Sequence, residues 1–506
     1  MDDKKKEKTG WINEVREKVN SSCLMDHWSN PCTTIFKVPQ HIRQLDDKAY
    51  DPVVASFGPF HHERFDNSYW GPTMQDHKWR CVRYFLSCHG SRESQLLHRC
   101  LSELKEQDSK VRSCYSQEFS TLDAQNMALI MLLDGCFIIY LMLKMKESTD
   151  QAREGEVVLN IEGKKKLPEY PTVAGLFTLD LVVHDLLKLE NQIPFFIIEL
   201  LFNHLNPCED RNIGLVKLAL RLFKDIHPKK SKSFMERPPS EYHHLLHLFY
   251  SSRIPAGWPH DPIECTKSKL EKGEPATESK MSEGKKVDMK SECKKAEAIS
   301  KPEWIPSATE LDRAGVKFKK NESADGFLNI TFGQRRMKIT PLLCLLKLYL
   351  IFRSGRMEIP PLRIYDYTGP LFRNLIAFEQ CYYNTKMYIT IYALFMDCII
   401  DKAEDVRLLH LVGILEHKLS SDQAVAELFN KLGCHIHFVS KKNYLANQIE
   451  RVNKFYDSSW HKWLAALRRD YLRNPWAIIS VLAAMFLLLL TVEQAIFAAL
   501  SYFHPS

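Results

Sequence analysis

A long uncharged apolar run near the C-terminal end constrains this sequence most strongly. Residues 476–492 read WAIISVLAAMFLLLLTV and contain no charged side chain. At about 1.5 Å of rise per residue, these seventeen residues would reach roughly 26 Å as a helix, close to the hydrocarbon thickness of a bilayer. Continuing to Leu500 exceeds that thickness. The sequence therefore predicts one transmembrane helix from Trp476 to Leu500, with Glu493 near the far interface, where a charge costs less.

The charges around this run predict its orientation. Arg468, Arg469 and Arg473 precede it, and no Lys or Arg follows it. The positive-inside rule then places the bulk of the chain in the cytosol. The first ten residues, MDDKKKEKTG, lack an apolar segment, so we expect no signal peptide and a single-pass, tail-anchored protein. The alternatives are a buried core helix and a glycolipid-anchor signal, and the type of membrane stays open.

Composition excludes several classes of protein. Apolar residues make up 45% of the 506 positions, which is typical of a globular protein with a core. A net charge of +7 is too weak over this length to predict nucleic-acid binding. The 14 cysteines include no C-x-x-C pair, so zinc-finger patterns are absent. We expect reduced thiols, with Cys136, Cys344 and Cys398 acting as small buried hydrophobic side chains.

Changes in composition divide the chain into five parts. The segment 264–300 carries nine lysines and eight acids without an aromatic residue, which predicts a disordered insertion. The predicted parts are a charged tail with a short helix (1–31), the first part of a helical domain (32–260), the Lys/Glu-rich insertion (261–301), the second part of the domain (302–473) and the membrane anchor (474–506).

Helical spacing of apolar residues predicts a mainly α fold, a large globular body with a few short strands. The apolar run 127–143 has the length of a second membrane span, but Asp134 at its centre favours a buried core helix. Residues 327–332 and 337–339 flank GQRR and predict a β-hairpin near 327–339, and Ser307 with Glu310 predicts a capping box. The predicted helices are 74–88, 93–110, 124–145, 176–202 broken at Pro194, 213–223, 242–250, 371–381, 388–400, 405–419, 424–432 and 444–473.

No catalytic or phosphate-binding motif is present. Walker, dinucleotide-binding and nucleophile-elbow patterns are all missing, so no catalytic residue and no cofactor is assigned. His243 and His247 are four residues apart and would share a helix face, as two metal ligands can. No third ligand is identifiable. Surface or loop-capping histidines are the alternative, and we assign no metal.

Four acids lie in strongly apolar surroundings: Asp134, Glu190, Glu379 and Asp397. Buried carboxylates can act in acid–base chemistry. The alternative is that each accepts hydrogen bonds from a helix terminus or pairs inside the core with Arg43, Arg373 or a histidine. An enzyme would need Asp134, Glu190 or Glu379 to converge with His61 or His62 on an open cleft, whereas acids dispersed and paired in the core would count against it.

A series of sequence blocks follows in order along the chain: FKVP (36–39), Arg43, YDP (50–52), SFGPFHH (56–62), Lys78, MLLDGCF (131–137), LENQIPFF (189–196), PSATEL (306–311), AGVKF (314–318), FRNLIAFEQ (372–380), LFN (428–430) and PWA (475–477). In order and composition, these blocks resemble a known plant family, domain of unknown function 247. The resemblance covers about residues 32–500 and implies a plant protein with one C-terminal membrane span, without established catalytic residues or cofactor. Some grass members of that family are linked to self-incompatibility, a role that the sequence does not assign to this chain.

These observations together predict a function without catalysis. We expect a membrane-tethered, cytosol-facing interaction or signalling protein whose lipid contact is the C-terminal helix and whose partner is another protein. The alternative is an enzyme that uses the buried acids Asp134, Glu190 and Glu379 with His61 or His62, its reaction undefined.

Overall fold

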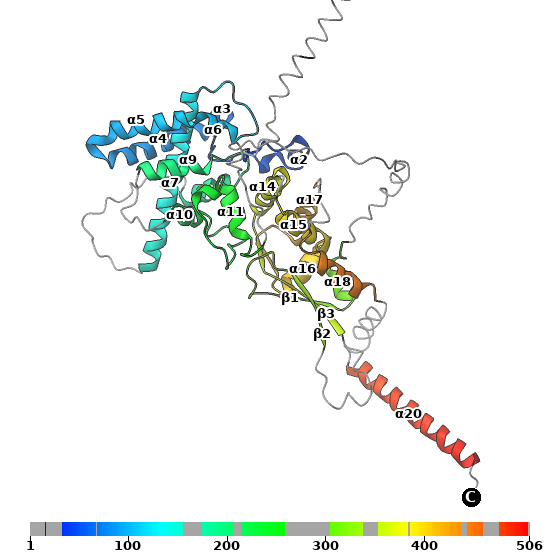
Figure 1. The fold of residues 1–506 in the computed structure, drawn as a ribbon. Coiled ribbons are helices and arrows are strands. Elements are labelled where there is room, and N and C mark those ends of the chain that lie inside the picture. The colour runs from blue at the N-terminus through cyan, green and yellow to red at the C-terminus, as the bar shows by residue number, and fades with distance from the viewer. Residues whose placement is uncertain are drawn as a thin grey trace, which may run out of the picture.

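The computed structural model describes residues 16, 33–66, 68–154, 175–205, 214–258, 304–336, 353–382, 385–434, 436, 443–458 and 475–503. The described chain is mainly helical, as predicted, with a few short strands (Figure 1). The predicted N-terminal helix, the insertion and the end of the predicted helix 444–473 lie outside these residues.

Helix α7 (Ala124–Glu154) is the centre of the N-terminal half. It packs against α4, α5, α9 and α10, and the side chains of its apolar run are buried. Within the described residues, Ala124–Met145 is the one stretch long and apolar enough to cross a membrane, and 89% of it lies buried. The prediction of a core helix is therefore confirmed, although α7 runs farther than expected, to Glu154. The other helices of this half are α2 (Gln40–Arg43), α3 (His62–Asp66), α4 (Gly71–Ser87), α5 (Glu93–Glu106), α6 (Asp108–Ser113), α8 (Gly175–Asp185), α9 (Phe195–Leu205), α10 (Leu215–Leu222) and α11 (Leu245–Arg253).

The C-terminal half combines helices with two small sheets. Helices α14, α15 and α17 pack together, while α12 contacts β1 and α18 contacts β2. The predicted capping box is confirmed, because Ser307 and Glu310 exchange hydrogen bonds at the start of α12. The elements are α12 (Ala308–Arg313), β1 (Val316–Lys320), β2 (Thr331–Arg336), β3 (Arg353–Ile359), β4 (Leu362–Ile364), α14 (Thr368–Cys381), α15 (Tyr388–Ile399), α16 (Ala403–Leu411), β5 (Leu415–His417), α17 (Asp422–Leu432) and α18 (Ala446–Tyr456).

The prediction of a β-hairpin near 327–339 is wrong about where the chain reverses direction. Gly333-Gln-Arg-Arg336 does not reverse the chain but continues β2, which pairs antiparallel with β3. The larger sheet has the order β1-β3-β2, with β1 and β3 parallel. Among the described strands, β2 pairs on one side only, so polar residues that read as a turn fit there as an edge strand. Residues 337–339 lie outside the described part of the chain.

Two predicted helices are shorter than their patterns implied. The predicted helix 405–419 ends at Leu411, because Gly413 adopts a φ of +73° and the chain then enters β5. A left-handed backbone of this kind suits glycine and interrupts a helix. The predicted helix 93–110 divides at Gln107 into α5 and α6.

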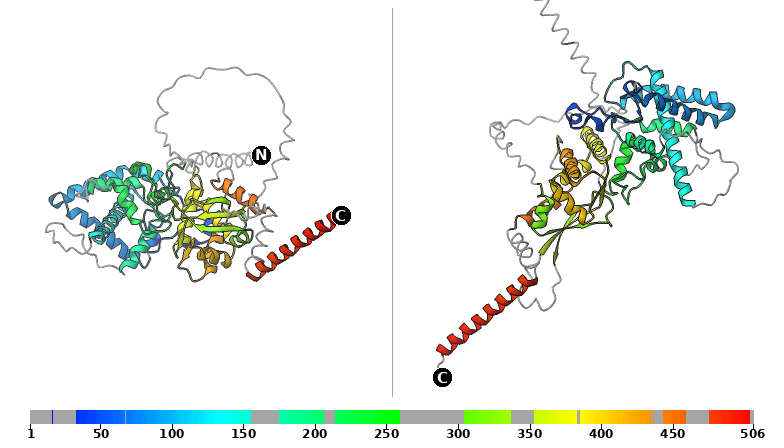
Figure 2. Two further views of the ribbon diagram at one scale, coloured as in Figure 1. Left: turned by 90° about the horizontal axis from the view of Figure 1, so that it is seen from below. Right: turned by 180° about the vertical axis from the view of Figure 1, so that it is seen from behind.

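The two halves meet through α14. Asn374 accepts a hydrogen bond from the Leu189 amide at 2.8 Å and donates one to the Ala49 carbonyl at 2.9 Å. Phe36 packs edge-on against Tyr382, with 6.0 Å between the ring centroids. Figure 2 shows the N-terminal helices on one side of this junction and the sheet with its helices on the other.

The last helix, α20 (Pro475–Phe503), lies apart from this body in every view (Figures 1 and 2). Its described apolar side chains are exposed, including Phe486 at 64%, Leu488 at 67% and Phe497 at 64%. Within α20, the apolar stretch among the described residues is Phe486–Ala498, shorter than the predicted span.

Candidate functional site

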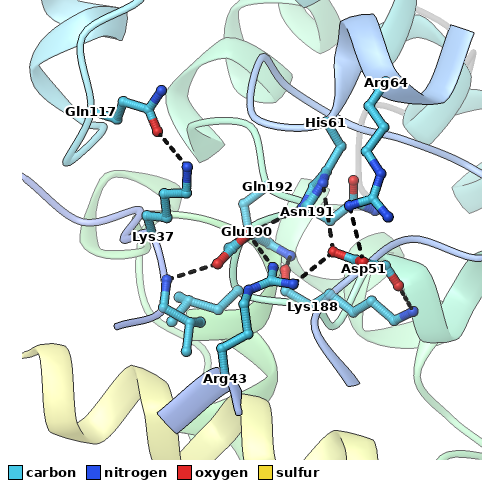
Figure 3. A network of polar contacts seen from close by, with 12 residues as sticks. Lys37, Arg43, Asp51, His61, Arg64, Gln117, Lys188, Glu190, Asn191 and Gln192 are labelled. Atoms are coloured by element: carbon cyan, nitrogen blue, oxygen red, sulfur yellow. Dashed lines mark hydrogen bonds and ion pairs between the residues drawn. The ribbon is translucent and has the colours of Figure 1, made fainter. Parts of the chain in front are cut away.

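Glu190 is the centre of a buried polar network shown in Figure 3. It lies in the loop that joins α8 to α9 and is only 2% exposed. Its carboxylate accepts hydrogen bonds from the Val38 amide at 2.8 Å and from Arg43 Nη2 at 2.7 Å, and His61 Nε2 lies 3.3 Å away. Burial alone would raise the pKa of Glu190, but His61, the Val38 amide and the Arg43 charge outweigh burial and lower this pKa. The carboxylate is therefore held in its charged form.

Arg43 extends the network from Glu190 to Asp51. Its Nη1 lies 2.9 Å from Asp51, which also receives Arg64 Nη1 at 3.2 Å. Burial works against the charge of Asp51, yet the hydrogen bond and charge of Arg43 leave the pKa of this carboxyl below its usual value. The same two acids raise the pKa of Arg43 despite its burial. These ion pairs therefore connect the segment that holds Arg43 and Asp51 to the loop between α8 and α9, which holds Glu190.

Asp185, at the end of α8, binds the adjacent backbone directly. Its carboxylate is fully buried and accepts hydrogen bonds from three successive amides, those of Val53, Val54 and Ala55, at 2.7–3.0 Å. The ammonium group of Lys188 lies 2.9 Å away and also donates to the Asp51 carbonyl. Three amides and one cation satisfy a buried carboxylate, so this contact fixes an otherwise irregular segment.

Asn191 and Gln192 bind the next part of that segment. Asn191 accepts from the Phe57 amide at 2.7 Å and donates to the Ala55 carbonyl at 3.0 Å. Gln192 accepts from the Leu246 amide at 3.1 Å, which connects the loop to α11. The side chains of Glu190, Asn191 and Gln192 therefore satisfy backbone groups of distant segments, as a buried irregular loop requires.

Asp134, in the middle of α7, forms a further buried ion pair. Its carboxylate lies 2.6 Å from Lys78 Nζ and accepts from the Gly58 amide at 2.7 Å, while Lys78 also donates to the Ser56 carbonyl at 2.7 Å. Gly58 has a φ of +71°, and a Cβ there would lie 2.5 Å from the Gln192 carbonyl oxygen. Only glycine fits this close approach. The partner of Asp134 is thus a lysine, neither of the predicted arginines nor a histidine.

Glu379 caps a helix inside the C-terminal half. It is fully buried on α14 and accepts from the Ile389 amide at 2.9 Å, the Thr390 amide at 2.7 Å and the Thr390 hydroxyl at 2.6 Å. These are donors at the start of α15, where a carboxylate is stabilised. Burial raises the pKa of Glu379 to about 7, although the hydrogen bonds from Thr390 and Ile389 act in the opposite direction. For Glu379, the structure therefore agrees with the predicted alternative in which a buried acid accepts hydrogen bonds from a helix terminus.

The remaining two residues singled out from the sequence, Arg373 and Asp397, are not part of the buried network around Glu190. Arg373 lies 3.6 Å from Asp46 and not beside any of the four predicted acids. Asp397 is half-buried, and burial followed by the nearby charge of Asp401 raises its pKa to about 6.

His243 and His247 do not share a helix face, which the four-residue spacing in HHLLH had suggested. His244 is extended and caps α11, accepting from the His247 amide at 3.2 Å, so His243 precedes the helix. The His243 ring stacks on His247 with centroids 4.8 Å apart, and His247 Nδ1 accepts from the His243 amide at 3.2 Å. Burial lowers the pKa of His243 to about 4 and that of His244 to about 3. In the described part of the chain, no group of three or more potential ligands is placed to hold a metal ion.

The predicted acids do not converge on a cleft. Glu190 meets His61 inside the core, Asp134 pairs elsewhere with Lys78, and Glu379 belongs to the other half. His62 lies outside the network and lines a surface cavity that none of these acids lines. Each acid is already occupied by several donors, so the geometry required for the enzyme alternative does not occur among the described residues.

Sequence reasoning missed Asp185 and Lys188. Both are buried, and Asp185 contacts more backbone amides than any acid that was singled out. A signal was present, because Asp185 lies in the apolar run LVVHDLL, the same kind of setting that marked Asp134. The predicted burial of thiols holds for Cys136, whereas Cys398 is half-buried and Cys344 lies outside the described residues.

The fold and the site together define a mainly helical protein. In this protein, buried charged and polar side chains hold the N-terminal segment, residues 38–58, against the polar loop between α8 and α9. The chain belongs to the DUF247 family, described as plant protein of unknown function, whose sequence profile matches residues 35–490. It is similar to a UPF0481 protein of Arabidopsis thaliana, 29% identical over 486 residues, which covers 95% of this chain and 89% of that protein. A putative UPF0481 protein of the same plant is 24% identical over 553 residues, covering 96% and 94%. No solved structure matches the chain.

Proposed function

We propose that this plant protein is tethered to a membrane by α20, faces the cytosol and acts through contacts with another protein. The observation that carries the proposal is the contrast between its two longest apolar helices. The apolar stretch of α7 is 89% buried, whereas Leu487, Leu488 and Leu489 of α20 are each more than 60% exposed. Burying apolar surface is worth about 25 cal/mol per Å². A bilayer would supply that burial along the whole helix.

Sequence charges support the orientation in this proposal. Residues 474–506 contain neither Lys nor Arg, whereas Arg468, Arg469 and Arg473 directly precede them. Under the positive-inside rule the folded body lies in the cytosol. Glu493 falls near the far end of the span from Trp476 to Leu500, where the cost of a charge is lower.

The role as an interaction or signalling component is supported by the way the acids are used. Glu190, Asp185 and Glu379 accept hydrogen bonds from backbone amides and stabilise the fold. Such a body presents a rigid surface on the membrane, to which a protein partner can bind.

Fractionation of cells that express the full chain tests the tether. The full chain is expected in the membrane pellet after alkaline carbonate washing, and a chain lacking 474–506 in the soluble fraction. Glu493→Gln serves as the control, because it keeps the apolar length and should stay in the pellet. A truncated chain that still resists carbonate would refute the tether.

Protease added to sealed vesicles tests the orientation. Digestion of the body without detergent is expected, and full protection until detergent is added would reverse the proposed orientation. Neither outcome depends on knowing the partner.

A further inference from the structure

A surface cavity of about 350 Å³ lies between α3, α4 and the N-terminal part of α7. The buried side chains of Ile130 and Leu133 line it. Its volume is near the lower end of the 300–1,000 Å³ range typical of ligand pockets. It therefore suits one side chain or a small fragment better than a whole cofactor.

The polar lining of this cavity favours a cation that donates hydrogen bonds. Glu63 contributes a carboxylate, and no lysine or arginine lines the cavity. Gln75 and Asn126 add amide oxygens, and Trp79 contributes an indole that is 48% exposed. Carboxylates bind guanidinium groups through paired hydrogen bonds, and arginine also stacks on aromatic faces.

We propose that this cavity receives an arginine side chain of a protein partner. The inference rests on the interaction role proposed above and names the chemistry of the contact. The guanidinium would lie against the Trp79 indole and pair with the Glu63 carboxylate. Tyr69 lies two residues before α4, is 87% exposed, and its ring packs edge-on against that of Trp70 with 5.3 Å between the centroids. Exposed tyrosine and tryptophan near a charged pocket are typical of the anchor regions of protein interfaces.

The cavity also adjoins the buried network. His62 lines it, while the preceding residue, His61, contacts Glu190, and Leu133 lines it immediately before Asp134. A partner bound here would therefore stabilise the segment that the network clamps, and we expect the melting temperature to rise on binding.

The test titrates small-molecule probes into the full chain in detergent micelles and measures their binding by saturation-transfer NMR. The probes are N-acetyl-arginine amide, its neutral analogue N-acetyl-citrulline amide, and free arginine. The blocked arginine is expected to bind at least tenfold more tightly than the citrulline probe. Free arginine should bind no more tightly than the blocked form, because a partner's side chain carries no charged α-groups. Tighter binding of free arginine would point to an amino-acid site and overturn the docking proposal.

Two variants tie the binding to the cavity. Glu63→Gln is expected to weaken binding of the arginine probe about tenfold and Trp79→Ala at least threefold. Both side chains are exposed, so the variants should keep their fold, as circular dichroism checks. Glu241→Gln, which alters an exposed carboxylate outside the cavity, should leave affinity unchanged.

Equal binding of arginine and citrulline, or unchanged affinity in both variants, would overturn the inference. Either result leaves the carbonate-extraction test of the tether untouched. Conversely, a full chain that is released by carbonate but still binds the arginine probe would refute the membrane anchor and leave the cavity proposal standing. The failures of the two proposals can therefore be told apart.

Discussion

Replacing Glu190 by glutamine should destabilise the protein strongly although it scarcely changes side-chain volume. In the native protein Glu190 receives Arg43 at 2.7 Å and the Val38 amide at 2.8 Å. Glutamine can still accept from the Val38 amide, but it leaves the partly buried Arg43 with Asp51 as its main counter-charge.

The expected cost follows from the burial of the pair. Breaking a buried ion pair by removing one partner typically costs about 3–5 kcal/mol. Because glutamine retains a hydrogen bond and Asp51 retains part of the charge compensation, we expect about 2–3 kcal/mol for Glu190→Gln. With a urea m-value of roughly 3 kcal/mol/M for a body of this size, the midpoint should fall by about 0.7–1 M.

The assay is urea unfolding of the full chain in detergent, followed by tryptophan fluorescence. Glu103→Gln is the matched control, because Glu103 pairs with Arg99 and His204 near the surface. Such pairs contribute about 0–1 kcal/mol. If Glu190→Gln costs no more than Glu103→Gln, the buried network does not hold the N-terminal segment and the reasoning fails.

Three further predictions use the same unfolding assay. Because the folded pKa of Glu379, about 7, lies above its usual 4.5, its contribution to stability is fully present below about pH 4.5 and is lost as the pH rises through 7. Glu379→Gln should remove this dependence, and an unchanged pH slope would contradict it. Gly58→Ala should cost more than 2 kcal/mol, whereas Gly214→Ala, with no atom near the added Cβ, should cost less than about 1 kcal/mol; equal costs would exclude the steric argument. Ser307→Ala should cost about 1 kcal/mol through loss of the capping box, and a neutral result would show that the cap is dispensable.

Local patterns in the sequence were enough to predict much of the secondary structure. Apolar spacing identified α4, α15 and α17 within a few residues, and the predicted break at Pro194 falls directly before α9, although α8 already ends at Asp185. The capping box at Ser307 was readable because all its hydrogen bonds fall within four residues. Helical hydrogen bonds join residues close in sequence, so local composition carries the information needed to predict them.

Strand pairing was less predictable for the opposite reason. The partner of β2 is β3, which begins more than fifteen residues later in the sequence. Strand β1 also pairs with β3, in parallel, although β2 lies between them in the sequence. Polar edge residues such as Gln334 resemble a turn until the neighbouring strand is known. The sequence alone therefore indicated strands near 327–339 but misplaced the turn.

The sequence by itself predicted that two long apolar segments are withdrawn from water, the buried helix that holds Asp134 and the proposed membrane span near the C-terminal end. Only the tertiary structure decided how the first is accommodated, by bringing Lys78 to 2.6 Å from Asp134. It likewise joined Glu190 to Arg43 across 147 positions of sequence. A buried charge requires a partner, which sequence can predict, but the choice of partner depends on which distant segments the packing of apolar helices brings together.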